Sequence, residues 1–334
     1  MYDKVLVQAD RLVKNFAGKH FFGNRADDVI HAVSEVSLTI YEGETMALVG
    51  ESGCGKSTLG RLLLRMIEPT SGSLQFDGKE ISGLSQNEMR AYSQKMQFIF
   101  QDPYASLDPR MTVYEIIAEP LVTHKVFATK EELRAKVIEL MKTVGIRPEF
   151  INRYPHQFSG GQRQRIGIAR AIALNPQFIV CDEPVSALDV SIQSQILNLL
   201  RDLQQQKGLT YLFISHDLGV VRYISNRVCV MFLGKICEIG ETEEIYSNPM
   251  HPYTKFLIEA VPTTDLSRRD QPRTILAGEI PSPVNPPSGC RFHTRCPFAQ
   301  PVCSEKEPEM KPVHNRLVAC HFAGNFSKEE EKAL

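Results

Sequence analysis

The stretch LVGESGCGKSTLG, residues 48–60, decides the fold class of this chain. It contains the pattern G-x-x-x-x-G-K-[ST], from Gly50 to Ser57. The apolar run TMALVG leads into the pattern as a buried strand would, and LGRLLLRMI continues it with apolar residues around one helical face. A strand, a glycine-rich loop and a helix in that order are the context of a phosphate-binding loop, so the stretch predicts an α/β nucleotide-binding fold.

The loop carries the residue types that nucleotide binding needs. Its glycines let backbone amides approach phosphate oxygens, and the N-terminus of the following helix adds partial positive charge. We expect Lys56 to reach the β- and γ-phosphates of ATP and the Ser57 hydroxyl to ligate Mg²⁺. The competing interpretation is a glycine-rich turn that binds no ligand, but in such a turn Lys56 would have no evident structural role. The loop residues assigned to ATP binding are Gly50, Glu51, Ser52, Gly53, Cys54, Gly55, Lys56, Ser57 and Thr58.

Strands and helices alternate on both sides of the loop. Short apolar runs predict strands at about 33–40, 97–101, 177–183, 209–215 and 227–233. Helical periodicity predicts helices at about 131–145, 160–174 and 191–206. In the first of these helices, Glu132 can pair with Lys136. The alternation predicts a largely parallel sheet with helices on its faces.

Two carboxylates end one of the predicted strands. The run QFIVCDEP places Asp182 at the strand end and Glu183 directly after it. Because side chains alternate along a strand, Asp182 is placed to hold Mg²⁺ and Glu183 to polarise the attacking water. Alone, such a pair could be a solvated strand end, and His216, which follows another strand, would on its own be more often structural. The phosphate loop in the same chain favours the functional interpretation.

Charge and hydropathy exclude several classes of protein. The 334 residues include 38 basic and 39 acidic side chains, a balance that gives no reason to expect a nucleic-acid partner. The start, MYDKVLVQAD, has charges where a secretory signal needs an apolar core. The longest apolar runs fall short of the ~20 residues that a membrane helix needs. We therefore expect a soluble, cytosolic protein.

The chain changes in composition after residue 262. Prolines become frequent and periodicity is lost, so we place a domain boundary near 262–275, a small loop-rich domain at 263–324 and a solvated tail at 325–334. Four of the eight cysteines fall in this part, namely Cys290, Cys296, Cys303 and Cys320. A region that buries little apolar surface needs an additional cross-link, such as a disulfide or a bound metal, to be stable. Because cytosolic thiols stay reduced, a metal site is a better interpretation than a disulfide framework.

The stretch FSGGQRQRIGIARAIAL, from Phe158, connects these observations. Ser159 can cap a helix whose first turn holds Gly160 and Gly161, which creates a second anion site. Residues 50–216 contain six motifs in order: the phosphate loop, FIFQDP with Gln101, FSGGQ, VCDEP, SALD ending at Asp189, and His216. Together they resemble the ATP-binding cassette family, in which leucine usually replaces Phe158. The resemblance implies a mixed sheet with a RecA-like core in a domain at 1–262, with a helical subdomain at about 103–175.

The resemblance also implies roles for single residues. Asp189 would lie at the seam of an ATPase dimer. Gln101 would sense Mg²⁺ and the attacking water, and His216 would contact the γ-phosphate. The residues that would contact the γ-phosphate of ATP held by a partner chain are Ser159, Gly160, Gly161 and Gln162. The expected catalytic set is Glu183, His216, Gln101 and Lys56.

In this family an aromatic side chain upstream of the phosphate loop usually stacks on adenine. Phe16 is the expected residue. Phe21 and Phe22 are alternatives, because they lie in a glycine-containing segment, 18–28, that looks like an insertion. A core position for Phe16 is the competing interpretation.

Further stretches narrow the branch of the family. FQDPYASLDPR, NPMHPYTKFLIEAVP and GEIPSPVNPPSGCRFHTRC resemble the ATP-binding subunits of oligopeptide and dipeptide importers, most closely their F-type subunit. The resemblance implies a peripheral, ATP-hydrolysing translocase subunit at the cytoplasmic face of the plasma membrane. Its partners would be a second, different ATPase subunit, two transmembrane permease subunits and, indirectly, an extracytoplasmic binding protein.

Other functions stay open as alternatives. Nickel and glutathione importers share the extension, and haem is a further candidate cargo. A soluble cassette ATPase that acts on nucleic acid or ribosomes tends to carry two cassettes or long coiled-coil insertions, which this sequence lacks. A metal-binding sensor would not need the intact hydrolytic set.

The four cysteines are separated by five, six and sixteen residues, wider than the usual C-x₂₋₄-C pairs of zinc sites. Four thiolates on irregular loops suit an iron–sulfur cluster, and the family resemblance points to [4Fe–4S] as well. Zinc is the alternative, with His293, His314 and His321 as substitute ligands. We expect a structural role for the bound group.

Overall fold

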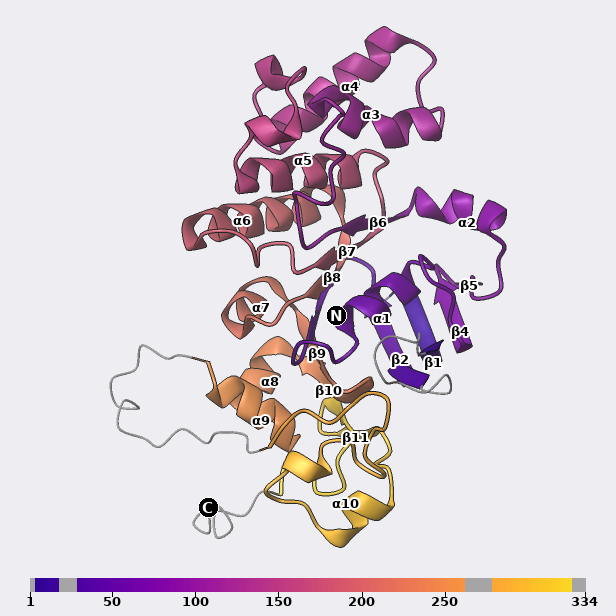
Figure 1. Ribbon diagram of the computed structural model, residues 1–334, viewed down its shortest axis with the longest axis vertical. Helices are drawn as coiled ribbons and strands as arrows, with labels where there is room; N and C mark the ends of the chain where they lie inside the picture. The colour runs from indigo at the N-terminus through magenta and orange to yellow at the C-terminus, as the bar shows by residue number, and fades with distance from the viewer. Residues whose placement is uncertain (1–3, 18–28, 262–277, 326–334) are drawn as a thin grey trace. The chain divides into compact units, whose positions relative to one another are not determined.

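The computed structural model describes residues 4–17, 29–261 and 278–325, which fall into two compact units (Figure 1). The first unit consists of residues 1–6, 40–44 and 83–214, and the second takes up the rest of the chain. Three predictions fall outside the described residues: the whole boundary at 262–275, the alternatives Phe21 and Phe22, and all but the first residue of the tail.

The first unit is built on three parallel strands. β7 (Phe178–Asp182) pairs with β6 (Met96–Ile99) on one side and with β8 (Thr210–Ile214) on the other. All residues of β7 and β8 are buried, as expected for the apolar runs of a parallel sheet that is covered on both faces. The predicted strands at 97–101, 177–183 and 209–215 are therefore confirmed, within a residue or two at each end.

The helices of this unit begin at capping residues that the sequence contains. Ser85, Thr112, Thr129 and Ser159 each accept a hydrogen bond from the third residue of the helix that follows. α3, α4 and α5 pack against one another through buried aliphatic side chains (Figure 1). The helices of the first unit are α2 (Gln86–Ser93), α3 (Val113–Thr123), α4 (Lys130–Thr143), η1 (Pro148–Phe150), η2 (Pro155–Gln157), α5 (Gly160–Ile172) and α6 (Val190–Lys207).

One predicted ion pair on α4 is wrong. Lys136 pairs with Glu139, with 2.7 Å between nitrogen and carboxylate oxygen. Glu132 instead accepts a hydrogen bond from the Thr129 amide at 3.2 Å. The capping position of Glu132 at the third residue of the helix explains the difference, since its carboxylate is used at the helix N-terminus.

The second unit contains two sheets. In one, the strand order is β2-β1-β4-β5. In the other, β3 and β9 are parallel, β10 is antiparallel to β9, and the hairpin β11–β12 follows, with β12 antiparallel to β10. The strands of this unit are β1 (Val5–Ala17), β2 (Val29–Tyr41), β3 (Thr45–Val49), β4 (Ser71–Phe76), β5 (Lys79–Glu80), β9 (Arg227–Phe232), β10 (Lys235–Glu241), β11 (Lys311–Val313) and β12 (Arg316–Val318). β3 and β9 thus pair in parallel, as the alternation predicts, and the antiparallel strands make the sheet mixed, as the family resemblance implies.

The C-terminal segment, residues 278–325, contains short regular elements that the sequence did not predict. Its hairpin pairs β12 with β10, with Glu238 opposite Val318 and Ile239 opposite Leu317. Strands of three residues are too short to give a detectable period. The helices of the second unit are α1 (Lys56–Leu63), α7 (Leu218–Ile224), α8 (Thr242–Ser247), α9 (Pro252–Glu259), η4 (His293–Arg295) and α10 (Pro301–Glu305).

None of the helices within 4–17, 29–261 and 278–325 combines the length and the apolar character needed to cross a bilayer.

Candidate active site

The predicted phosphate loop connects β3 to α1 in the second unit. Gly50 has a φ of 154°, and a Cβ atom there would lie 2.1 Å from the Met231 carbonyl oxygen. Gly55 caps α1 with a φ of 105°, and its Cβ would lie 2.2 Å from the Ala32 carbonyl oxygen. Glycine at both positions is therefore required by the path of the loop between β2 and β9.

The lysine of the loop turns back over it. Lys56 is 6% exposed, and its Nζ donates to the carbonyl oxygens of Gly50 at 2.8 Å and Glu51 at 2.9 Å. Burial raises the pKa of the neighbouring Cys54 thiol, which therefore stays protonated at neutral pH. The ammonium group thus lies over the loop, next to the N-terminus of α1, where positive charge and backbone amides favour an anion.

In the first unit the two expected catalytic residues Gln101 and Glu183 are in contact. Gln101, just beyond β6, donates from Nε2 to Oε2 of Glu183 at 2.8 Å. Glu183 follows β7 with a φ of 45°, a left-handed conformation that is uncommon for a residue other than glycine. Its amide donates to the Ile214 carbonyl oxygen at 3.0 Å, and Asp182 beside it is 3% exposed. Such strain in a carboxylate at a strand end is typical of functional sites.

The FSGGQ stretch forms the start of α5, as predicted. Ser159 is the N-cap, its amide donates to Gln162 Oε1 at 3.1 Å, and its hydroxyl accepts from the Gln162 amide at 3.4 Å. A Cβ on Gly161 would lie 2.4 Å from Cγ2 of Ile192 in α6. Asp189 is the N-cap residue of α6 and is exposed. The first turns of two helices therefore lie close together, and only a glycine fits between them.

The two remaining predicted nucleotide residues belong to the second unit. His216 lies just after β8 and is exposed. Phe16, in β1, is 37% exposed, and Nζ of Lys14 lies 5.0 Å from the centre of its ring. Phe16 is therefore not a core residue, and its ring is accessible for stacking.

Comparisons with known proteins bear directly on these motifs. A family model described as "ABC transporter" matches residues 33–186, and one described as "Oligopeptide/dipeptide transporter, C-terminal region" matches residues 237–303. The putative oligopeptide transport ATP-binding protein YkfD of Bacillus subtilis is 55% identical over 304 residues, 90% of this chain and 92% of that protein. The chain belongs to the ABC transporter family. The oligopeptide transport ATP-binding protein OppF of Escherichia coli is 50% identical over 321 residues, 95% of this chain and 96% of that protein.

Solved structures of ABC proteins share the fold. The ATP-binding cassette MJ0796, in a dimeric post-hydrolysis state bound to ADP and Pi, matches with a TM-score of 0.64 and 31% identity, over 71% of this chain and 99% of that one. CbiO1 of Clostridium perfringens matches with a TM-score of 0.63 and 26% identity, over 73% and 92% of the two chains. The predictions of an ABC cassette fold and of an ABC ATPase of the oligopeptide/dipeptide branch are confirmed.

The four predicted metal-ligating cysteines of this ABC ATPase line one small cavity in the second unit. The cavity has a volume of about 20 Å³, and its walls include Phe292, Phe298 and Phe322. Its cysteines are Cys290, Cys296, Cys303 and Cys320. Burial, reinforced by the neighbouring thiols, raises the pKa of Cys296 to about 12, and burial raises that of Cys320 to about 11. Nevertheless, within the described ranges no group of three or more His, Cys, Asp or Glu side chains is arranged to hold a metal ion.

The histidines named as substitute ligands differ in position. His293 and His321 line the cavity of the cysteines, and each uses one ring nitrogen in a hydrogen bond to a backbone carbonyl, of Cys290 at 2.8 Å and of Lys306 at 2.9 Å. His314 lies in the turn between β11 and β12, with a φ of 53°, and lines a different pocket. The structure therefore leaves His314 out of any site that the four cysteines form.

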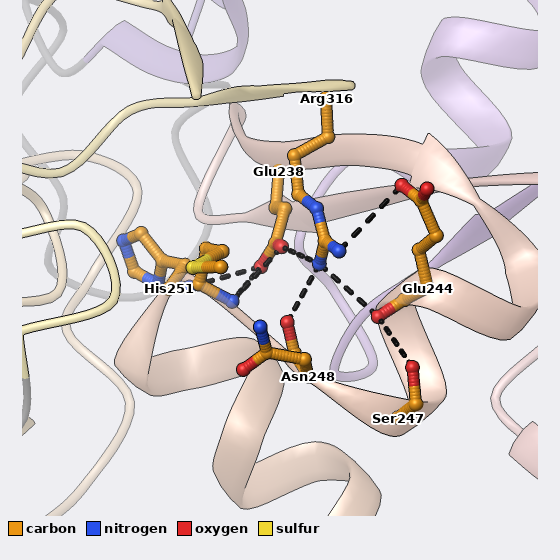
Figure 2. Close-up of polar contacts among 7 residues, drawn as sticks. Glu238, Glu244, Ser247, Asn248, His251 and Arg316 are labelled. Atoms are coloured by element: carbon orange, nitrogen blue, oxygen red, sulfur yellow. Dashed lines mark hydrogen bonds and ion pairs between the residues drawn. The ribbon is translucent and has the colours of Figure 1, made fainter. Parts of the chain in front are cut away.

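The sequence missed a buried ion pair that joins the C-terminal segment to β10. Arg316 of β12 lies between Glu238 and the carbonyl groups of α8 (Figure 2). Its Nη1 is 3.3 Å from Oε1 of Glu238, and it donates to the carbonyl oxygens of Glu244 at 3.1 Å and Asn248 at 2.7 Å. Glu238 is fully buried and also accepts hydrogen bonds from the amides that precede α9. The sequence did contain a signal for this ion pair: Glu238 lies within the apolar strand KICEIGE, and a carboxylate buried in such a strand needs a cationic or hydrogen-bonding partner.

Proposed function

We propose that this chain hydrolyses ATP to power an ABC importer of di- and oligopeptides. The observation that carries the proposal is the match of two family models along one chain, one for the cassette and one for the peptide-transporter C-terminal region. The relatives that share half of its residues over more than 90% of both chains are described as oligopeptide transport ATP-binding proteins. Nickel, glutathione and haem are the alternative cargoes, and a non-transport ATPase is a weaker alternative.

Each predicted motif would contribute one part of ATP binding or hydrolysis. Backbone amides from Gly50 to Thr58 would bind the phosphates, and Lys56 would neutralise their charge. Mg²⁺ would be held by Ser57, Gln101 and Asp182, which offer the oxygen ligands that this ion prefers. Glu183 would accept the proton of the attacking water, and His216 would steady that water. The contact between Gln101 and Glu183 supports a shared role for these two residues.

The signature residues would complete the site of a second chain. Ser159, Gly160, Gly161 and Gln162 start α5, where backbone amides and the helix dipole favour an anion, and this supports binding of a γ-phosphate there. Asp189 would lie at the seam. Phe16, whose ring is accessible, would stack on adenine.

The subunit composition of the transporter would be that of oligopeptide and dipeptide importers. The chain would pair with a second, different ATPase subunit beneath two transmembrane permease subunits, fed by an extracytoplasmic binding protein, at the cytoplasmic face of the plasma membrane. Residues 1–262 would form the ATPase domain with a helical subdomain at about 103–175, and residues 263–324 a small cysteine-bearing domain. No nucleic acid would take part.

Reconstitution tests the cargo. The chain, purified with its permease and binding protein in vesicles, is expected to hydrolyse ATP several-fold faster when di- or oligopeptides of mixed sequence are added. Nickel, glutathione and haem are the parallel additions. Stimulation by one of these and not by peptides would replace the proposed cargo, and co-purification with ribosomes but not with membranes would contradict the transport function.

We also propose that the four cysteines hold a [4Fe–4S] cluster that cross-links the C-terminal segment. What supports the proposal is that four thiols, the ligand type of such a cluster, line one aromatic-walled cavity, and zinc is the alternative. Because burial keeps Cys296 and Cys320 protonated at neutral pH, uptake would release their protons. Loading would therefore weaken as the pH falls.

Metal analysis tests this site. Protein purified without oxygen is expected to be brown, with about four iron and four sulfide per chain. Exchanging Cys296 and Cys303 for serine is expected to abolish the colour. The matched control is Cys229→Ala, which removes a buried thiol that does not line the cavity and should leave the iron in place. A colourless protein with one zinc per chain would contradict the cluster.

A further inference from the structure

The first variable residue of the phosphate loop, Glu51, is held by the C-terminal segment. Arg295 donates from Nη1 to Oε2 of Glu51 at 2.7 Å and from Nη2 to Oε1 at 3.1 Å. The arginine side chain is 6% exposed and the glutamate side chain 23%. A two-pronged arginine–carboxylate contact that is shielded from water fixes the orientation of both groups.

The backbone of Glu51 is held as well. Its amide donates to the hydroxyl oxygen of Tyr253 in α9 at 2.8 Å, and its carbonyl oxygen accepts from Nζ of Lys56 at 2.9 Å. Tyr253 is fully buried, with its ring 4.8 Å from that of Phe232 and 5.3 Å from that of Phe292. Burial raises the pKa of its hydroxyl, which therefore stays neutral. The amide, the carbonyl and the carboxylate of Glu51 are thus each bonded to a different residue.

A simpler function for the ion pair would be to attach the C-terminal segment to the rest of the unit. That attachment already has other sources, among them the β10–β12 pairing and the Glu238–Arg316 ion pair. Arg295 reaches none of those residues and contacts the loop that precedes α1 instead. Arg295 lies five residues after Cys290 and directly before Cys296. Its contact with Glu51 therefore links the phosphate loop to the segment that lines the cysteine cavity.

We propose that Arg295 is a positioning residue for ATP binding, acting through Glu51. By fixing Glu51, Arg295 and Tyr253 reduce the conformational freedom that the phosphate loop must lose when it closes around phosphates. The inference rests on the proposed role of residues 50–58 in binding ATP. It assigns to the C-terminal segment a direct effect on nucleotide affinity, separate from any effect on cargo or on permease contacts.

The test is the dissociation constant of the purified full-length chain for a fluorescent ATP analogue with Mg²⁺. Arg295→Met and Glu51→Gln are each expected to raise the constant about tenfold, since roughly one residue of loop backbone gains freedom. The double variant is expected to match the single ones, because both changes remove one interaction. Arg295→Lys, which keeps the charge but not the two-pronged contact, is expected to recover part of the affinity.

Two further variants make the outcome decisive. Arg222→Met is the matched control, because Arg222 makes a similar bidentate contact with Glu243 at the surface, with distances of 3.2 and 2.7 Å. This variant should bind ATP normally. Lys56→Ala should lose binding altogether. If Lys56→Ala fails to bind ATP but Arg295→Met binds it with wild-type affinity, the inference is overturned. A lower midpoint of thermal unfolding in Arg295→Met would not change that conclusion. Additive effects in the double variant would also overturn it. Normal binding by Lys56→Ala would refute the proposed ATP site itself, and the inference with it.

Discussion

Exchanging Glu183 for glutamine is expected to lower ATP turnover by at least about 100-fold while ATP binding persists. Glutamine has the shape of glutamate, and its amide oxygen can still accept the hydrogen bond that Gln101 donates at 2.8 Å. It cannot accept a proton from water, which is the step assigned to Glu183. The left-handed backbone at this residue, with a φ of 45°, is expected to be equally tolerated because the side chain keeps its size.

Turnover is measured at saturating ATP with the chain in its reconstituted transporter, and binding by equilibrium titration. Glu139→Gln is the matched control, since it makes the same chemical change at an exposed helical carboxylate whose partner is Lys136. Turnover within about twofold of wild type in Glu183→Gln would remove this residue from the catalytic set. Loss of binding together with turnover would instead indicate that Glu183 supports the nucleotide site structurally.

Exchanging Arg316 for methionine is expected to destabilise the protein by about 3–5 kcal/mol. The change leaves the carboxylate of Glu238 buried without its cationic partner, and it removes the hydrogen bond that Arg316 donates to the carbonyl oxygen of Asn248 (Figure 2). Such a loss is several times that expected of a surface pair. Arg222→Met, which breaks the exposed pair with Glu243, is expected to cost at most about 1 kcal/mol.

The measurement is the midpoint of urea-induced unfolding, compared between variants whose transitions have equal slopes. Glu238→Gln combined with Arg316→Met is expected to recover part of the loss, because it removes the unpaired charge while an amide oxygen can still accept from the backbone before α9. A double variant less stable than Arg316→Met alone would show that the charge of Glu238 is not the source of the penalty.

Local motifs were predictable from the sequence because their physics is local. The phosphate loop needs glycines at Gly50 and Gly55, and the signature needs a cap at Ser159, and each of these is set by residues within a few positions. The strand ends that carry Asp182 and Glu183 followed from short apolar runs. These features were enough to recognise the family, and the family's motif pattern then predicted most residues of the candidate site.

Contacts between distant segments were not predictable. Glu51 and Arg295 are 244 positions apart, and Glu238 and Arg316 are 78 apart. No periodicity or motif links such pairs, because their meeting depends on how the C-terminal segment folds onto β10 and α9. The cysteines are an intermediate case. Their clustering in sequence predicted one shared metal site, and they do line one cavity, but whether their sulfur atoms can reach a common metal depends on loop geometry that spacing does not set.

The pairing of β12 with β10 determines where the sheet of the second unit ends. Without the hairpin, β10 would be an outer strand with open amide and carbonyl groups along Glu238 and Ile239, which is a template for self-association. The outer position is instead taken by β11, whose three residues include Pro312 and Lys311 and discourage further pairing. We therefore expect a chain ended at residue 261, which lacks four of the eight cysteines, to aggregate more readily than the full-length chain.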